Sequence, residues 1–93
     1  MKVQFSKLFL KRYKKADVRI RHSIDKQIRL FRKDPTESSL NNHALKKEYE
    51  GLRSIDITGD YRAIFEEVKE PDRTFAYFVT FGTHKELYSV HTL

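Results

Sequence analysis

Hydrophobic residues recur at helical spacing through the first third of the chain. Four of them, at intervals of four, four and three residues, are Ile20, Ile24, Ile28 and Phe31. This spacing predicts a helix with one apolar face. Asp17 is a suitable N-cap for this helix, which should end before Pro35, because the residue preceding a proline is disfavoured in the helical conformation. An earlier helix should run from the N-cap Ser6 to about Lys15, after a short strand at residues 2–5.

The second half of the chain changes to a period of two, which is typical of strands. Three strands are predicted, separated by turn sequences at residues 58–60 and 70–73, and they cover residues 52–57, 61–68 and 74–81. The last of these strands is apolar on both faces, so it should lie in the interior of the sheet. A short helix or tail follows it, and residues 43–45 are expected to form a short, extended piece within a polar loop.

The order of these elements is a strand, two helices, three strands and a short terminal helix or tail. This order predicts an α+β fold, in which the two N-terminal helices cover one face of a small, mainly antiparallel sheet. The opposite face is then expected to be open. No repeat and no long linker divides the sequence, so residues 1–93 are predicted to form a single domain.

Positive charge is concentrated in the first third of the chain. Residues 1–33 hold twelve Lys and Arg against two Asp, a net charge of +10, whereas residues 34–93 hold seven against eleven acidic residues, a net charge of −4. A basic segment of this density is typical of a protein that binds phosphate backbones or an acidic protein segment. It is equally typical of a solvated helix face that is rich in lysine.

Composition makes several kinds of protein improbable. The chain contains no cysteine, which removes disulfides and thiolate chemistry and fits a cytoplasmic protein. Its four histidines do not have the spacing of a zinc site, so no metal or other cofactor is expected. No apolar run reaches the roughly 18 residues of a membrane span, and no signal-peptide pattern is present, so no membrane partner is expected.

Four residues have the chemistry needed to cut RNA without a metal, and these are His43, Asp60, Arg62 and His84. His84 follows the last predicted strand; the alternative is a loop histidine that begins a short helix. His43 lies in a polar loop, where a histidine is more often a plain surface residue. Asp60 lies in a turn, where aspartate is common for purely local reasons.

Arg62 has a more specific environment than the other three. It is predicted to lie within a strand on the open face, where it either pairs with Glu66 or is available to a phosphate. Tyr61 and Tyr88 could stack on bases or simply pack against other side chains. The remaining histidines are expected to be solvated surface residues, His22 and His91.

Three motifs extend this pattern, and together they resemble toxins of the RelE/ParE superfamily over essentially the whole chain. The motifs are NHAL at residues 42–45, GLR at 51–53 with DYRAIF at 60–65, and GTHKELY at 82–88. They are most similar to the YafQ-type branch, whose members belong to type II toxin–antitoxin pairs and cut message on the ribosome. The G-T-H-x-x-L-aromatic ending is the most specific motif, whereas the Tyr-Arg strand also occurs in superfamily members that do not cut RNA.

The resemblance implies roles for individual residues. Three of them match catalytic residues of that branch: His43, Asp60 and His84. Arg62 matches an arginine that binds phosphate in RelE-like enzymes, which adds it to the catalytic set. Tyr61 stands where the branch has a tryptophan, and Tyr88 where it has an aromatic residue at the chain end, so both are expected to contact the substrate.

Two positions depart from the branch. Asp56 stands where a second upstream histidine is found, and Thr80 stands where the last strand carries an arginine. The positive charge that this arginine supplies to the transition state would then have to come from Arg62, Arg53, Lys46 or Lys47.

The resemblance therefore implies a ribosome-dependent mRNA endoribonuclease that inhibits translation. Its partners would be the ribosome, the message and an antitoxin with an acidic C-terminal segment. Two alternatives stay open: a ParE-type inhibitor of DNA gyrase without RNA chemistry, and a non-catalytic module whose basic helices bind an acidic partner. The histidine pair argues against the gyrase inhibitor, because a gyrase-binding surface has no need of an acid and a base.

Overall fold

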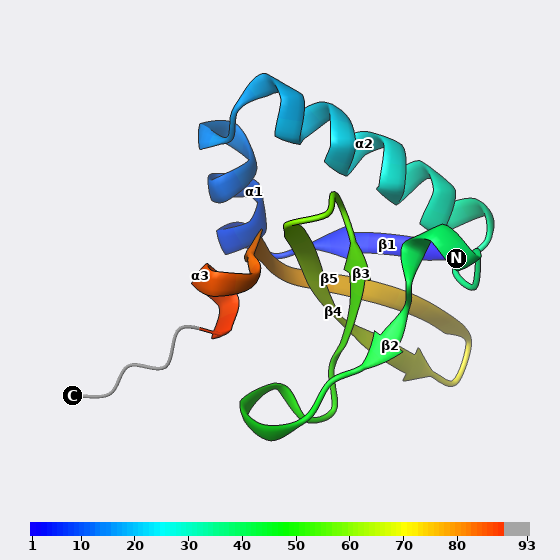
Figure 1. The fold of residues 1–93 in the computed structure, drawn as a ribbon. Coiled ribbons are helices and arrows are strands. Elements are labelled where there is room, and N and C mark those ends of the chain that lie inside the picture. The colour runs from blue at the N-terminus through cyan, green and yellow to red at the C-terminus, as the bar shows by residue number, and fades with distance from the viewer. Residues whose placement is uncertain (89–93) are drawn as a thin grey trace.

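The computed structural model describes residues 1–88, and its elements follow one another in the predicted order (Figure 1). The strands are β1 Lys2–Phe5, β2 His43–Ala44, β3 Arg53–Asp56, β4 Tyr61–Glu70 and β5 Arg73–Thr83. The helices are α1 Lys7–Lys15, α2 Val18–Lys33 and α3 His84–Tyr88, with the 3₁₀ helices η1 Ser38–Leu40 and η2 Lys47–Tyr49. The short, extended piece predicted at residues 43–45 is confirmed as the two-residue strand β2.

The strands form one sheet in the order β1-β5-β4-β3-β2. β1 runs parallel to β5, and all other neighbours are antiparallel. β5 therefore has a strand on each side, as its two apolar faces predicted, although the middle strand of the five is β4. The register between β4 and β5 shifts between Ile64 and Phe65. Ala63, Ile64 and Phe65 are all buried, because both faces of β4 are covered at this point.

Both long helices begin where the sequence predicted. The Ser6 side chain accepts a hydrogen bond from the N–H of Phe9 at 2.9 Å, which caps α1. The Asp17 carboxylate accepts from the N–H of Arg19 at 2.7 Å, which caps α2. These side chains satisfy backbone donors that the first turn of a helix leaves without partners.

An aromatic cluster fills the space between the helices and the sheet. Phe31 of α2 packs edge-on against Phe65 and Phe78, with ring centroids 5.0 and 5.3 Å apart. Phe9 of α1 packs in the same way against Phe81 at 4.9 Å. All five rings are at most 4% exposed. The apolar stripes of the two helices therefore form the core, and the α+β arrangement predicted from the sequence is confirmed.

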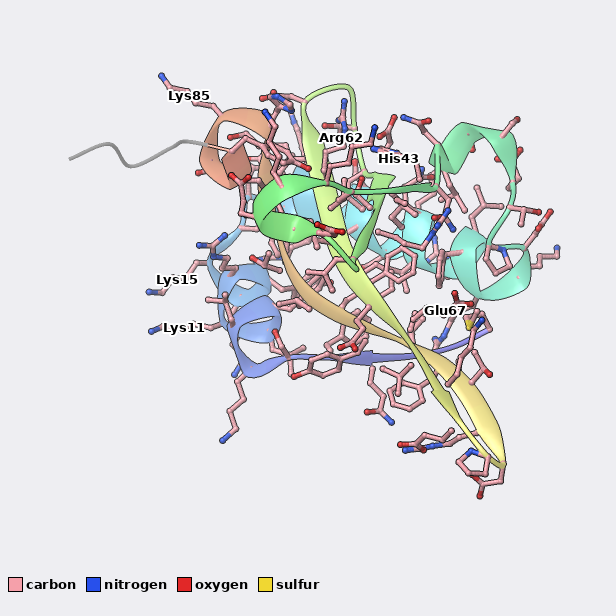
Figure 2. All side chains as sticks on the ribbon, turned by 90° about the horizontal axis from the view of Figure 1, so that it is seen from below. Lys11, Lys15, His43, Arg62, Glu67 and Lys85 are labelled. Atoms are coloured by element: carbon pink, nitrogen blue, oxygen red, sulfur yellow. The ribbon has the colours of Figure 1, made fainter. Side chains whose placement is uncertain are left out.

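The opposite face of the sheet is only partly open. Ser54, Ile64 and Thr80 lie on it and are nevertheless buried. α3 and the segment that contains η2 lie on this side, away from α2 (Figures 1 and 2). They are joined by a hydrogen bond of 2.6 Å from the hydroxyl of Tyr49 to the carbonyl of Leu87. The expectation of an open face is therefore wrong for its middle, because these two short helices cover it. Within residues 1–88, no helix is long and apolar enough to cross a membrane.

Candidate active site

The register of the sheet places several predicted residues in two adjoining rows on the face opposite the helices. Directly opposed residues of neighbouring strands project to the same face. One row consists of His43, Ser54, Ile64 and Thr80. The next row, two residues closer to the β3–β4 turn, consists of Asp56, Arg62 and Gly82. Since neighbouring strands are about 4.8 Å apart, His43, Arg62 and the start of α3 lie along one end of this face, where Figure 2 shows both labelled side chains.

His43 is held in one tautomer by its neighbour in the chain. It is exposed on the edge strand β2, and its Nδ1 lies 2.7 Å from the carbonyl oxygen of Asn41. A carbonyl oxygen can only accept a hydrogen bond, so in the neutral ring the proton resides on Nδ1 and the lone pair on Nε2. Nε2 is therefore ready to accept a proton, which is the requirement for a general base.

Arg62 is engaged on two sides of its guanidinium group. Its Nε lies 2.9 Å from Oδ1 of Asp56, the residue directly opposite on β3. Its Nη1 donates to three carbonyls of the turn at residues 58–61, at 3.0–3.2 Å. Within residues 1–88, Nη2 has no hydrogen-bond partner, so one donor pair of the guanidinium group remains for a ligand. The predicted pairing with Glu66 is wrong, because the acidic partner of Arg62 is Asp56, which lies directly opposite it on β3.

Asp60 and His84 are brought together through the backbone. The N–H of His84 donates to the carbonyl oxygen of Asp60 at 3.1 Å, which ties the start of α3 to the β3–β4 turn. The hydroxyl of Thr58 accepts from the N–H groups of Asp60 and Tyr61 at 3.2 and 3.0 Å and so fixes the turn itself. The side chains of Asp60 and His84 are both exposed, and each is therefore accessible to a ligand.

The motif around His84 is also the start of a helix. The hydroxyl of Thr83 accepts from the N–H of Glu86 at 3.1 Å, and the Glu86 carboxylate accepts from the N–H of Thr83 at 2.8 Å. This reciprocal pair is a capping box. A side chain at Gly82 would place its Cβ 3.0 Å from the Glu86 carboxylate, so glycine leaves room for the box. The spacing of Thr83 and Glu86 is the sequence signal of such a box.

Two tyrosines complete this corner of the molecule. The ring of Tyr88 lies beside that of His84, with centroids 4.7 Å apart. Tyr49 of η2 meets Tyr88 edge-on at 5.3 Å. Burial first, and then the neighbouring Tyr49, raise the pKa of the Tyr88 phenol above its ordinary value, so Tyr88 stays a neutral donor near neutral pH. Sequence reasoning missed Tyr49, whose only signal is an aromatic residue among charged ones.

The other predicted binding residues are spread over different parts of the surface. Tyr61 packs partly against the core on the face covered by the helices. Arg53 also projects to that face, and its Nε donates to the amide oxygen of Asn42 at 2.9 Å. Lys46 and Lys47 are exposed at the start of η2, beside α3. The two lysines thus belong to the segment whose Tyr49 contacts α3, whereas Tyr61 and Arg53 project to the other face of the sheet.

Thr80 stands at the position where the resemblance predicts an arginine, and its side chain contacts an arginine of α1 instead. Nη1 of Arg12 donates to the Thr80 hydroxyl at 3.1 Å and to the carbonyl of Phe81 at 3.0 Å. β1 ends opposite Phe78, so these bonds satisfy the outer edge of β5 that β1 leaves uncovered. Arg12 is thus an edge residue that the sequence pattern did not reveal. Of the remaining histidines, His22 is exposed on α2 as predicted, and His91 lies outside the described residues.

No protein-family model matches the chain, and no curated protein matches it significantly. Solved structures do match it. YafQ from E. coli strain BL21(DE3) is 20% identical, with a TM-score of 0.74 over 92% of this chain and 96% of that one. A YoeB/ParE toxin from Agrobacterium tumefaciens is 20% identical, with a TM-score of 0.71 over 90% and 99%. A chain of the E. coli DinJ-YafQ toxin–antitoxin complex is 20% identical, with a TM-score of 0.72 over 92% and 94%.

These similarities extend over nearly the full length of each chain, while the sequences have diverged far. The protein therefore has the fold of RelE/ParE-like toxins, as the three sequence motifs predicted. Within that fold, the residues that could carry chemistry are gathered where β2, β3 and β4 meet the start of α3.

Proposed function

We propose that this protein is the toxin of a type II toxin–antitoxin pair and acts as a ribosome-dependent mRNA endoribonuclease. One observation carries the proposal more than any other. Two exposed imidazoles come from elements on either side of Arg62 at one end of a sheet face: His43 from β2, two strands away, and His84 from the start of α3, two residues after the Gly82 that lies opposite Arg62. This is the set of groups that cleavage of RNA by its own 2′-hydroxyl requires: a base, an acid and a positive charge.

In the proposed reaction, Nε2 of neutral His43 takes the proton of the 2′-hydroxyl, which its tautomer favours. The 2′-oxygen attacks the neighbouring phosphorus, and the bond from phosphorus to the 5′-oxygen breaks. Protonated His84 donates a proton to that leaving oxygen. The products are a 2′,3′-cyclic phosphate and a 5′-hydroxyl, so the protons and electron pairs balance. Each positioned acid or base contributes about 10²–10⁴-fold to the rate.

Arg62 supplies the positive charge for the pentacoordinate phosphorus intermediate. Its Nε and Nη1 are already occupied, so Nη2 is the part that donates to a phosphate oxygen. Asp56 orients the group and also reduces its net charge, because a carboxylate 2.9 Å away attracts the same guanidinium. Asp60 stays in the proposed catalytic set as an exposed carboxylate of the adjoining turn, joined to His84 through the bond from the His84 N–H to its carbonyl oxygen.

RNA binding is assigned to two surfaces. At the site, Tyr88 offers a ring for a base to stack on, and Lys46 and Lys47 offer charge to the phosphates. Away from the site, α1 carries exposed lysines, of which Lys11 and Lys15 point outward in Figure 2. A basic surface of this kind gives a grip on ribosomal RNA that does not depend on sequence.

The proposed antitoxin is recognised by the same basic surface. One of the matching structures is a toxin–antitoxin complex by its description. For this chain, we infer a partner with an acidic, amphipathic C-terminal segment that folds on contact, since residues 1–33 carry a net charge of +10. Its association rate should fall steeply with added salt while its dissociation rate changes little. An association rate that is indifferent to salt would rule out this mode of recognition.

A translation reaction with purified ribosomes and a defined message tests the function. Cleavage is mapped by primer extension for the protein itself, for His84→Ala and for the matched control His22→Ala, which removes an exposed histidine in the second turn of α2. We expect cleavage at the ribosomal A site that is lost only in His84→Ala. Intact message, combined with inhibition of purified gyrase, would instead support the ParE-type function. Intact message without gyrase inhibition would support the third alternative, a non-catalytic module that binds an acidic partner.

A further inference from the structure

α3 is too short to be stable by itself. It contains five residues, His84–Tyr88, and an isolated helix of this length has too few internal hydrogen bonds to compensate for its ordering entropy. Its first turn is held by the capping box of Thr83 and Glu86. Its last carbonyls have no partner within the helix, so the position of its C-terminal end depends on another element.

The end of α3 is held by Tyr49, a residue of η2. Its hydroxyl donates to the carbonyl of Leu87 at 2.6 Å, across 38 residues of sequence. The segment that presents Tyr49 is held by backbone hydrogen bonds of its own. The N–H of Tyr49 donates to the carbonyl oxygen of Lys46 at 3.2 Å, and the N–H of Leu52 donates to the carbonyl oxygen of Tyr49 at 3.0 Å. The N–H of Leu45 donates to the carbonyl oxygen of Leu52 at 2.9 Å and closes the loop. Tyr49 therefore projects from a closed loop rather than from a free one.

The same side chain is the first of three rings in contact. Tyr49 meets Tyr88 edge-on, with the ring planes at 86° and the centroids 5.3 Å apart. Tyr88 meets His84 at 4.7 Å and 39°. Edge-on and tilted contacts of this kind are favourable and have a preferred geometry. The orientation of the His84 ring is thus determined by Tyr88, whose own ring is restrained by Tyr49.

We propose that Tyr49 is a positioning residue for His84. It fixes the C-terminal end of α3 through the Leu87 carbonyl, and it fixes the imidazole through the ring of Tyr88. It does not touch the reacting atoms. The catalytic consequence of this role rests on the proposed endoribonuclease function, whereas the structural consequence, a defined orientation of His84, does not.

The kinetic test uses two substitutions of graded severity. Tyr49→Phe keeps the ring and removes only the bond to Leu87, and we expect kcat to fall about 5-fold, as for the loss of one net hydrogen bond. Tyr49→Ala removes the ring as well, and we expect kcat to fall about 100-fold, as for a misplaced catalytic group. KM should change little in both. Tyr77→Phe, on the half-buried Tyr77 of β5, is the matched control and should match the unmodified protein.

A second measurement does not depend on RNA cleavage. The imidazole proton resonances of His84 are recorded by NMR for the same variants, because the ring current of Tyr88 shifts them. We expect them to move in Tyr49→Phe and to approach the values of an unstructured histidine in Tyr49→Ala, with unchanged resonances in the core.

The outcomes separate the two proposals. Unmoved His84 resonances in Tyr49→Ala, or full cleavage by that variant, would overturn the positioning role while leaving the endoribonuclease function intact. Shifted resonances in a protein that cuts no message would support the positioning role and contradict the function. If Tyr49→Ala does not fold, the test rests on Tyr49→Phe, because this variant keeps the aromatic ring. Unmoved His84 resonances in Tyr49→Phe would then overturn the positioning role.

Discussion

The two faces of the sheet use the same strands for opposite purposes. On the face covered by the helices, Phe65 and Phe78 are buried in an aromatic cluster with Phe31. On the other face, the same strands present an ion pair, Arg62 with Asp56, beside exposed imidazoles at the sheet end. The centre of the first face is packed with apolar rings, whereas the second face holds a guanidinium group with one donor pair still available.

This difference shows how a chain of this size separates stability from chemistry. Successive residues of a strand point to opposite faces, so neighbouring positions can serve the core and the site independently. We therefore expect substitutions on the helix-covered face to change the free energy of unfolding, and substitutions on the other face to change the rate of RNA cleavage. The effects below run from the largest to the smallest.

Phe31→Ala should have the largest effect, and it should be on stability. The side chain is fully buried between two other rings, so its removal leaves a cavity and should cost about 3–5 kcal/mol. Urea denaturation followed by circular dichroism measures this. Leu8→Ala, at a leucine that is 45% exposed on α1, is the control and should cost far less. A similar loss in both variants would show that the core is not where the fold places it.

His84→Ala should have the complementary effect. We expect the cleavage rate to fall about 10²–10⁴-fold, because a proton donor is lost. The thermal midpoint should stay close to that of the unmodified protein, because the side chain is exposed. Single-turnover cleavage and differential scanning calorimetry are measured on the same preparation. A folded variant with full activity would exclude His84 from the chemistry.

Arg62→Lys should lower cleavage by about 10²-fold, which is typical for the loss of one oriented donor to a developing oxyanion. Lysine keeps the charge but cannot pair with Asp56, reach the turn carbonyls and donate to a phosphate at the same time. Ribosome affinity, measured by sedimentation, should be roughly kept. Cleavage at the original rate would mean that Arg62 only stabilises the turn at residues 58–61 and takes no part in the reaction.

Asp56→Asn should have the smallest effect and the opposite sign. Removing the carboxylate releases positive charge on Arg62, so binding of a short RNA should tighten a few-fold, while stability changes by less than about 1 kcal/mol. Fluorescence anisotropy measures the affinity. Weaker binding would mean that the ion pair holds Arg62 in its binding position, and that this outweighs the released charge.

Much of the fold could be predicted because its signals are local. The spacing of Ile20 to Phe31 and the caps at Ser6 and Asp17 identify the two helices without any knowledge of their partners. The turns and the alternation of β3 were equally local. The two-residue strand β2 was recognised only as an extended piece, because a strand this short depends on pairing with Ser54 and Arg53.

The site was predictable as a list of residues but not as a set of contacts. The partner of Arg62 depends on the register of β3 against β4, which no local pattern reveals. The bond from Tyr49 to Leu87 and that from Arg12 to Thr80 span 38 and 68 residues. Contacts of this kind exist only once the sheet has formed, and they decide whether the site is ordered.

The pH dependence of cleavage on the ribosome tests the central claim most directly. A base that must be deprotonated and an acid that must be protonated predict a bell-shaped profile of kcat/KM. His43→Ala should lose the rising limb at low pH, because the base is removed, and His84→Ala should lose the falling limb at high pH, because the acid is removed. A profile that keeps both limbs in either variant would contradict the assignment of these two histidines as the acid and the base.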